Sequence, residues 1–244
     1  MSAAVASRSS NVPRESARAH SIRRLRRDEL PQHTVALTRY LIGKVVVHEL
    51  PQGRVSGRIV EAEAYPPGDP AGHHFRGPTP RIRSMYMAPG HAYVFFNYGA
   101  HFMLNVSSEP EGTAGGILIR ALEPLDGIAI MEKNRGAAEL LDLTRGPGRL
   151  AAALQITRAH DGIDLTASQT LWLGELIAPV SEIVHARRIA GVGTTVRIGI
   201  TRAADHLLRF YERGNPFVSG PKHLLAQRSA KTKPRARSKA GSTR

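Results

Sequence analysis

The chain has 244 residues, a formal net charge of +14 and no cysteine. Without cysteine it can form no disulfide, no thiolate nucleophile and no zinc or iron–sulfur site with cysteine ligands. No apolar run approaches the roughly 18 residues of a transmembrane helix, and the N-terminus lacks the apolar core of a signal peptide. We therefore expect a soluble protein of the cell interior with no membrane contact.

The positive charge is concentrated at the two ends of the chain. Residues 1–28 carry seven arginines and two acids, and residues 221–244 carry eight lysines or arginines and no acid. These ends hold +5 and +8 of the net charge, so residues 29–220 are nearly neutral. Such basic segments, poor in apolar residues, are predicted to be disordered tails around one domain over 29–220. Flexible basic arms can also strengthen salt-dependent binding to nucleic acids.

Apolar periodicity and turn residues predict the elements between the tails. The predicted helices cover 34–43, 125–135, 137–143 and 147–155. The predicted strands cover 45–50, 54–65, two strands hinged near Tyr98 and Gly99, then 115–124, 170–173, 183–188, 195–200 and 208–212. Strands that come first and helices that are grouped later indicate an α+β fold with a largely antiparallel sheet.

The stretch EAEAYPPGDPAGHHF begins at Glu61 and combines acids, a tyrosine and two histidines. In a strand, Glu61, Glu63 and Tyr65 share one face and the intervening alanines point to the other. Such a face is most often the solvated side of a sheet. The stiff, proline-rich detour that follows brings His73 and His74 back toward the strand, which favours a functional site.

Other kinds of site find weaker support. A metal site would use Glu61 or Glu63 with His73 and His74, and with His91 or His101 as a further ligand, but the spacing matches no HExxH pattern. The sequence contains no GxSxG serine motif and no GxxxxGK phosphate loop. The stretch AGVGTTV at 190–196 is interpreted as an ordinary turn.

A dense aromatic cluster occupies the segment YVFFNYGAHFMLNVSS. Tyr93, Phe96 and Phe102 fit the core of a strand pair. Tyr98 stands at the predicted hairpin tip, where an aromatic side chain projects outward and can stack on bases or wedge into a duplex. The preceding loop carries three arginines that can hold phosphates, which are Arg76, Arg81 and Arg83.

Taken together, these segments resemble the alkyladenine (3-methylpurine) DNA glycosylase family. The matching stretches occur in the family's order and read GRIVEAEAY, DPAGHHFRGPTPR, MYMAPGHAYVFFNYGAHFMLNVSS, GILIRALEPLDG, GPGRLAAAL and LRFYERG. The resemblance runs from about Leu30 to Val218 and leaves only the tails outside. It implies a single domain around a curved, mostly antiparallel sheet flanked by helices, with no metal or other cofactor.

The resemblance also implies roles for individual residues. Glu63 matches the general base that activates a water, and Arg120 matches a residue that helps to hold this water. Tyr98 matches the wedge that replaces the flipped nucleotide in the duplex. The positions that contact the flipped base are matched by Tyr65, His73, Phe95 and Asn105, and Asn105 is expected to limit access by normal guanine. Either His73 or His74 could fill its position, and the pattern Asp-x-Ala-x-His, present as DPAGH, favours His73.

We therefore predict a glycosylase that removes alkylated or deaminated purines, such as 3-methyladenine, 7-methylguanine, hypoxanthine and ethenoadenine, from duplex DNA. Alkylation at the 3- or 7-position makes the base cationic and weakens its bond to the sugar. No amine nucleophile lies near the motifs, so the enzyme is expected to be monofunctional. We expect a monomer in the cytoplasm or on the nucleoid. The alternatives are a non-catalytic binder of damaged or distorted DNA and a metal hydrolase built on Glu61, Glu63 and His73.

Overall fold

The computed structural model describes residues 20–97, 99–136, 138–177 and 191–225. Within these ranges, nine strands form one sheet, and every pair of neighbouring strands is antiparallel. The strand order is β1-β7-β2-β3-β6-β5-β4, with β9 also paired to β3 and β8 paired to β9. The strands are β1 (Ile22–Arg24), β2 (Val45–Leu50), β3 (Gly53–Tyr65), β4 (Ala92–Asn97), β5 (His101–Ser107), β6 (Gly116–Pro124), β7 (Leu171–Leu176), β8 (Val192–Thr195) and β9 (Arg209–Glu212).

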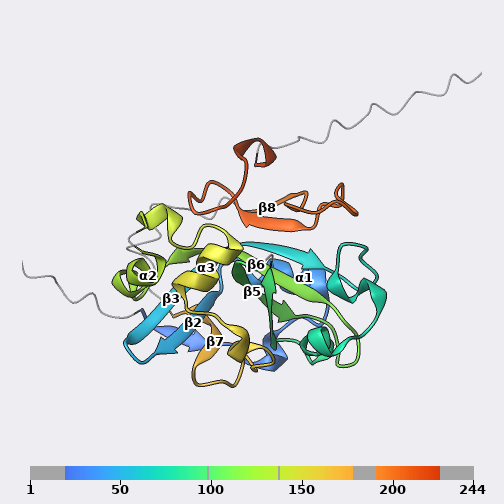
Figure 1. Cartoon of the computed structure of the whole chain (residues 1–244), viewed down its shortest axis with the longest axis horizontal. Helices are drawn as coiled ribbons and strands as arrows, with labels where there is room; N and C mark the ends of the chain where they lie inside the picture. Colours follow the sequence, from blue (N-terminus) through green and yellow to red (C-terminus); the bar gives the residue numbers. More distant parts are fainter. Residues whose placement is uncertain (1–19, 98, 137, 178–190, 226–244) are drawn as a thin grey trace, which may run out of the picture.

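Three α-helices accompany the sheet in the described ranges, which confirms the α+β fold in a single domain (Figure 1). They are α1 (Thr34–Leu41), α2 (Ile128–Arg135) and α3 (Pro147–Ala153). Short 3₁₀ helices include η2 (His73–Arg76), η3 (Pro80–Tyr86) and η4 (Leu140–Asp142). None of these helices is long and apolar enough to cross a bilayer.

Helices α1 and α3 pack against the central strands and bury the main core with them. In α1, Leu37 and Leu41 lie one turn apart on the buried face, as the apolar period predicted. The carboxylate of Glu109 accepts the N–H of Thr34 at 2.8 Å, which satisfies a free donor of the first turn and fixes where α1 begins. In α3, Pro147 occupies the first turn, as expected.

The predicted elements up to residue 135 agree with the structure within a few residues, whereas several later ones differ. The predicted helix over 137–143 is only the 3₁₀ helix η4, and the predicted strand over 183–188 lies outside the described residues. The interpretation of 190–196 as a turn is wrong, because β8 occupies Val192–Thr195 and pairs with β9. The strand predicted over 195–200 is wrong as well, because residues 196–200 form irregular backbone beside the sheet.

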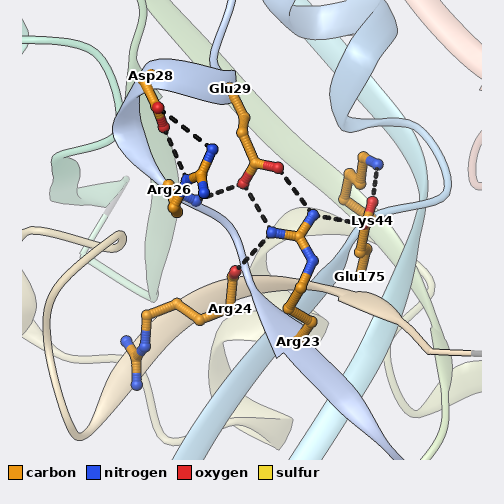
Figure 2. Close-up of polar contacts among 7 residues, drawn as sticks. All are labelled: Arg23, Arg24, Arg26, Asp28, Glu29, Lys44 and Glu175. Atoms are coloured by element: carbon orange, nitrogen blue, oxygen red, sulfur yellow. Dashed lines mark hydrogen bonds and ion pairs between the residues drawn. The ribbon is translucent and has the colours of Figure 1, made fainter.

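The N-terminal boundary of the fold differs from the prediction. Residues up to 28 were expected to be a disordered tail, but β1 pairs with β7 and Leu25 is fully buried. Figure 2 shows Arg23 between Glu29 and Glu175, with hydrogen bonds of 2.9 and 2.8 Å to the Glu29 carboxylate. The hydrogen bonds from Arg23 are the main cause that lowers the pKa of Glu29 to about 2. Arg23, Arg26 and Arg27 thus have acidic partners in the folded domain, a relation that the count of arginines alone could not reveal.

The C-terminal boundary is also later than residue 220. A 3₁₀ helix, η6, covers Lys222–Leu224, and Leu225 packs against a second apolar cluster. The hydroxyl of Tyr211 donates a hydrogen bond to the carbonyl oxygen of Leu225 at 3.3 Å. The remaining parts of both predicted tails lie outside the described residues.

The long strand β3 changes phase at its centre. The pairing between β3 and β6 shifts around Glu61, so that Val60 and Arg120 are skipped in the register. Ile59 and Ala62, three residues apart, both belong to the main core, whereas strict alternation would send them to opposite faces. Val60 instead joins the second apolar cluster with β9. This pair of bulges re-aims the end of β3, so its polar side chains lie on the side away from the main core.

Candidate active site

A cavity of about 410 Å³ opens beside the sheet, at the end of β3. Strands β3, β4, β5 and β6 supply most of its wall. The rest comes from the loop before η2, from η2, η3 and the first residue of α3, and from residues 198–200. Its aromatic and amide lining comes from Tyr65, His73, Tyr93, Phe95, Asn97 and Asn105. A concave site with a mainly apolar wall and a few polar groups suits a flat heterocyclic ligand.

Glu63 lies directly behind this wall and is fully buried. Its Oε2 accepts a hydrogen bond from the Tyr65 hydroxyl at 2.9 Å, and its Oε1 accepts one from the Ile198 backbone N–H at 2.8 Å. The Nη1 of Arg120 lies 3.2 Å from Oε1. All three partners also line the cavity. Three donors on one carboxylate suit its ionised form.

Arg120 joins Glu63 to a second buried acid. Its Nε donates to Oε1 of Glu61 at 2.9 Å, and the same oxygen accepts from Nε of Arg209 at 2.7 Å. Burial alone disfavours the charge on Arg120, but the carboxylates of Glu63 and Glu61 outweigh it and raise the pKa of Arg120. Glu61 is therefore a buried ion-pair partner, and the face of β3 that it shares with Glu63 is not solvated.

Tyr65 stays protonated in this setting. Burial, followed by the charge and hydrogen bond of Glu63, raises the pKa of the Tyr65 phenol well above its usual value. Its hydroxyl therefore remains a donor to Glu63 throughout the neutral range.

The two neighbouring histidines take different positions. His73 lines the cavity, and its Nδ1 lies 2.8 Å from the Tyr93 hydroxyl. His74 is buried, and its Nε2 contacts the carbonyl oxygen of Pro66 at 2.8 Å. Although the His73 ring is exposed toward the cavity, partial desolvation, with the charges of Arg81 and His74, lowers its pKa. The structure thus selects His73, in its neutral form at pH 7, as the cavity residue.

Phe95 and Asn105 line the cavity as well. The Phe95 ring packs edge-on against His73, with 4.5 Å between ring centres, and stacks on Tyr93 at 5.5 Å. The Nδ2 of Asn105 donates to the carbonyl oxygen of Tyr93 at 3.2 Å, which fixes the orientation of this amide at the cavity wall. Burial raises the pKa of Tyr93 to about 12, which keeps its hydroxyl protonated beside His73.

The three arginines of the basic loop are exposed. The Nη2 of Arg81 donates to the carbonyl oxygen of Phe96, the residue after Phe95, at 3.4 Å. Arg76 and Arg83 stand on η2 and η3. Tyr98, the predicted wedge, lies outside the described residues. Phe96, predicted to lie in the core, is 43% exposed on the same hairpin.

The alternative metal site finds no support in the described part of the chain. No group of three or more histidine, aspartate or glutamate side chains is arranged there to hold an ion. Glu61 and Glu63 are engaged by arginines instead.

The sequence profile described as Methylpurine-DNA glycosylase matches residues 28–216. A protein of Mesorhizobium japonicum is 57% identical over 85% of this chain and 98% of its own length. A Paraburkholderia phytofirmans protein is 50% identical over 82% of the chain and 90% of its own length, and one of Chlorobium phaeobacteroides is 41% identical over 82% and 96%. All three are provisionally named 3-methyladenine DNA glycosylase.

The chain belongs to the methylpurine-DNA glycosylase family. It is therefore a DNA glycosylase, an enzyme of base excision repair that hydrolyses N-glycosyl bonds. The predicted resemblance is confirmed, and the alternative of a non-catalytic DNA binder does not fit a family of hydrolases.

Several residues of this glycosylase site were not found from its sequence. Tyr93 was assigned to the core, yet its alternation with Phe95 along β4 places both rings on the cavity side. The segment around Ile198 was predicted as a strand, and nothing in its sequence indicates that a backbone N–H would reach Glu63. Two methionines, Met85 and Met103, also line the cavity and were missed for lack of a motif.

Proposed function

We propose that this glycosylase removes purines alkylated at N3 or N7, and deaminated or etheno-modified purines, from duplex DNA. The observation that carries the proposal is an aromatic cavity whose wall, at Tyr65, Arg120 and Ile198, is hydrogen-bonded to the buried carboxylate of Glu63. A damaged nucleotide leaves the duplex and its base enters this cavity. Edge and face contacts from His73, Phe95 and Tyr65 then hold the flipped base.

In the proposed mechanism, Glu63 is the general base. It takes a proton from a water molecule held beside Arg120, and the oxygen of this water attacks the anomeric carbon as the base departs. The sugar gains oxocarbenium character in the transition state, and the negative charge of Glu63 stabilises it. An N3- or N7-alkylated purine leaves as a neutral base and accepts no proton, whereas a deaminated or etheno-modified purine leaves with the bonding electron pair as an anion and takes a proton from solvent water. Removing a general base lowers the rate by about 10² to 10⁴.

Two features limit the outcome of the reaction. Among the described residues that line the cavity there is no lysine, so an imine with the opened sugar has no partner there. We therefore propose a monofunctional enzyme that leaves an intact abasic site. Asn105 presents a polar group to the base, and Phe95 supplies stacking without a hydroxyl, so both set the range of accepted purines.

The test uses methylated duplex DNA and a separate duplex with one hypoxanthine, both in the presence of EDTA. We expect release of 3-methyladenine and hypoxanthine, and abasic sites that break only on later treatment with alkali. Glu63→Gln should bind the lesion duplex as the wild type does and lose release by at least 100-fold. Unchanged release by Glu63→Gln would remove Glu63 from its role, and direct strand cleavage would contradict a monofunctional enzyme.

A further inference from the structure

A buried ion pair lies behind the cavity wall, between Arg197 and Asp69. The Nη2 of Arg197 donates to Oδ1 of Asp69 at 3.1 Å, and its Nη1 contacts Oδ2. The same Nη1 donates to the carbonyl oxygen of Ala64 at 2.9 Å. The guanidinium carbon also lies 4.6 Å from the centre of the Tyr65 ring. Arg197 thus holds the end of β3 through its backbone, its aromatic side chain and an acid from the following loop.

Asp69 organises the turn that leads to His73. Its Oδ1 accepts the backbone N–H of Ala71 at 3.0 Å, and its carbonyl oxygen accepts the N–H of Gly72 at 2.9 Å. An aspartate that bonds to backbone two residues ahead fixes a tight turn. Because Ala71 and His73 both line the cavity, the position of Asp69 determines how this part of the wall is presented.

Arg197 is also the residue before Ile198, whose N–H reaches Glu63. The backbone around residues 196–200 has no regular strand pairing, so it relies on side chains for its position. Besides Arg120, the donors to the Glu63 carboxylate are the Tyr65 hydroxyl and the Ile198 N–H. Both are attached to the Arg197–Asp69 ion pair, because Tyr65 stacks on Arg197 and Ile198 follows Arg197 in the chain.

We infer that Arg197, held by Asp69, is a positioning residue for base release: it keeps the Tyr65 hydroxyl and the Ile198 N–H directed at Glu63, and it fixes the turn before His73. This inference rests on the proposed role of Glu63. Arg197 itself does not line the cavity and does not touch the base. Lysine would retain the charge but lose the planar fork that binds Asp69 and Ala64 together and stacks on Tyr65.

The test compares Arg197→Lys with a matched variant, Arg58→Lys. Arg58 is also buried and pairs with Glu212 at 2.7 Å and with Glu123, but it does not line the cavity. In free protein, exchange of the Ile198 amide hydrogen is followed by NMR, relative to the amide of Ile59, which donates to a backbone oxygen at 2.7 Å in the sheet. Release of methylpurines from methylated duplex DNA is measured in a single turnover, and binding to undamaged duplex is measured separately.

We expect Arg197→Lys to speed exchange at Ile198 relative to Ile59 at least tenfold and to slow base release at least tenfold. Binding to undamaged duplex should stay within twofold, and Arg58→Lys should change neither the exchange ratio nor the rate of release. Unchanged exchange and release in Arg197→Lys would overturn the inference, as would equal losses in both variants. If Arg197→Lys does not fold, Asp69→Asn carries the same test, because the asparagine oxygen keeps the bond from the Ala71 N–H while its NH₂ cannot accept from the Nη1 of Arg197. A wild-type protein that releases no methylpurine, but whose Ile198 exchange responds to Arg197, would overturn the proposed function and uphold the positioning.

Discussion

Glu61 and Glu63 stand two residues apart on one strand, are both fully buried, and should respond in opposite ways to the same substitution. At Glu61, every neighbour that bonds to the carboxylate is a donor that cannot become an acceptor: two guanidinium groups and the backbone N–H of Ser219, at 2.6 Å. A glutamine amide at this position must therefore point its NH₂ at a donor in either orientation.

At Glu63 the situation differs, because one of its partners is the hydroxyl of Tyr65. A hydroxyl can turn from donor to acceptor, so the NH₂ of a glutamine can face Tyr65 while its oxygen keeps the bonds from Ile198 and Arg120. Glu63→Gln thus retains a full set of hydrogen bonds but loses the negative charge and the basic oxygen.

Because their partners differ, the two variants should lose different amounts of unfolding free energy. Glu61→Gln leaves Arg120 and Arg209 without their shared counter-ion, and loss of one partner from a buried ion pair costs about 3 to 5 kcal/mol of unfolding free energy. In a domain of this size this corresponds to a melting temperature lower by roughly 6 to 20 °C. For Glu63→Gln we expect at most about 1 to 2 kcal/mol, the difference between charged and neutral hydrogen bonds, together with the loss of base release.

The assay combines urea unfolding, followed by circular dichroism, with single-turnover release of methylpurines at a temperature at which both variants are folded. The expected pattern is a large stability loss with residual release in Glu61→Gln, and a small stability loss with severely reduced release in Glu63→Gln. Equal destabilisation of the two variants, or an unchanged melting temperature in Glu61→Gln, would refute the assignment of donors around the two carboxylates.

Three further outcomes follow from the same structure. In the Glu63→Gln background, Phe95→Ala should weaken binding of the lesion duplex by about 1 to 3 kcal/mol, or roughly 5- to 150-fold in Kd, whereas equal Kd values would exclude base stacking on this ring. Arg81→Ala should weaken binding to all duplexes alike and reduce the slope of log Kd against log salt by about 1, and an unchanged slope would mean that Arg81 contacts no phosphate. Burial lowers the pKa of His48 and of His160 from 6.5, so below that pH the unfolded chain binds more protons than the folded one. The free energy of unfolding should therefore fall as the pH falls, by at most about 1.4 kcal/mol per pH unit for each histidine. Urea unfolding at pH 7.5 and 5.5 should show a smaller fall in His48→Gln than in the wild type, and an equal fall would mean that His48 does not contribute to the pH dependence.

Much of the fold could be read from local patterns. The strand over 45–50 matches β2, because its valines are bounded by Gly43 and by the turn at Pro51. The apolar spacing alone was enough to predict the helix at 34–43. The prediction for the N-terminal segment was wrong because Leu25 is a single apolar residue among arginines, and because Arg23 pairs with Glu175 from a distant part of the chain. Composition measures charge and cannot show where its counter-charges lie.

The lining of the cavity was predictable where the family resemblance named a strand residue, because Phe95 on β4 and Asn105 on β5 both line it. It was not predictable where backbone supplies the chemistry. The N–H of Ile198 reaches Glu63 from 135 residues away in sequence, and any residue except proline could donate it. The phase change in β3 left no signal either, because Ile59, Val60 and Ala62 are all apolar and fit either face.

This phase change shows how a cavity wall with a buried carboxylate could accept the cationic base that we propose as substrate. The bulges direct Glu61, Glu63 and Arg120 to the same side of the sheet, where Arg209 from β9 completes a group of two acids and two arginines. A buried carboxylate needs a counter-ion to stay charged. If Arg120 and Arg209 faced Glu63 alone, the group would carry a net positive charge beside the cavity and repel an N3- or N7-alkylated purine. Glu61 balances the second arginine, so the group of two acids and two arginines has no net charge, and in the proposed mechanism the developing charge on the sugar meets the Glu63 carboxylate without opposition from an unpaired guanidinium.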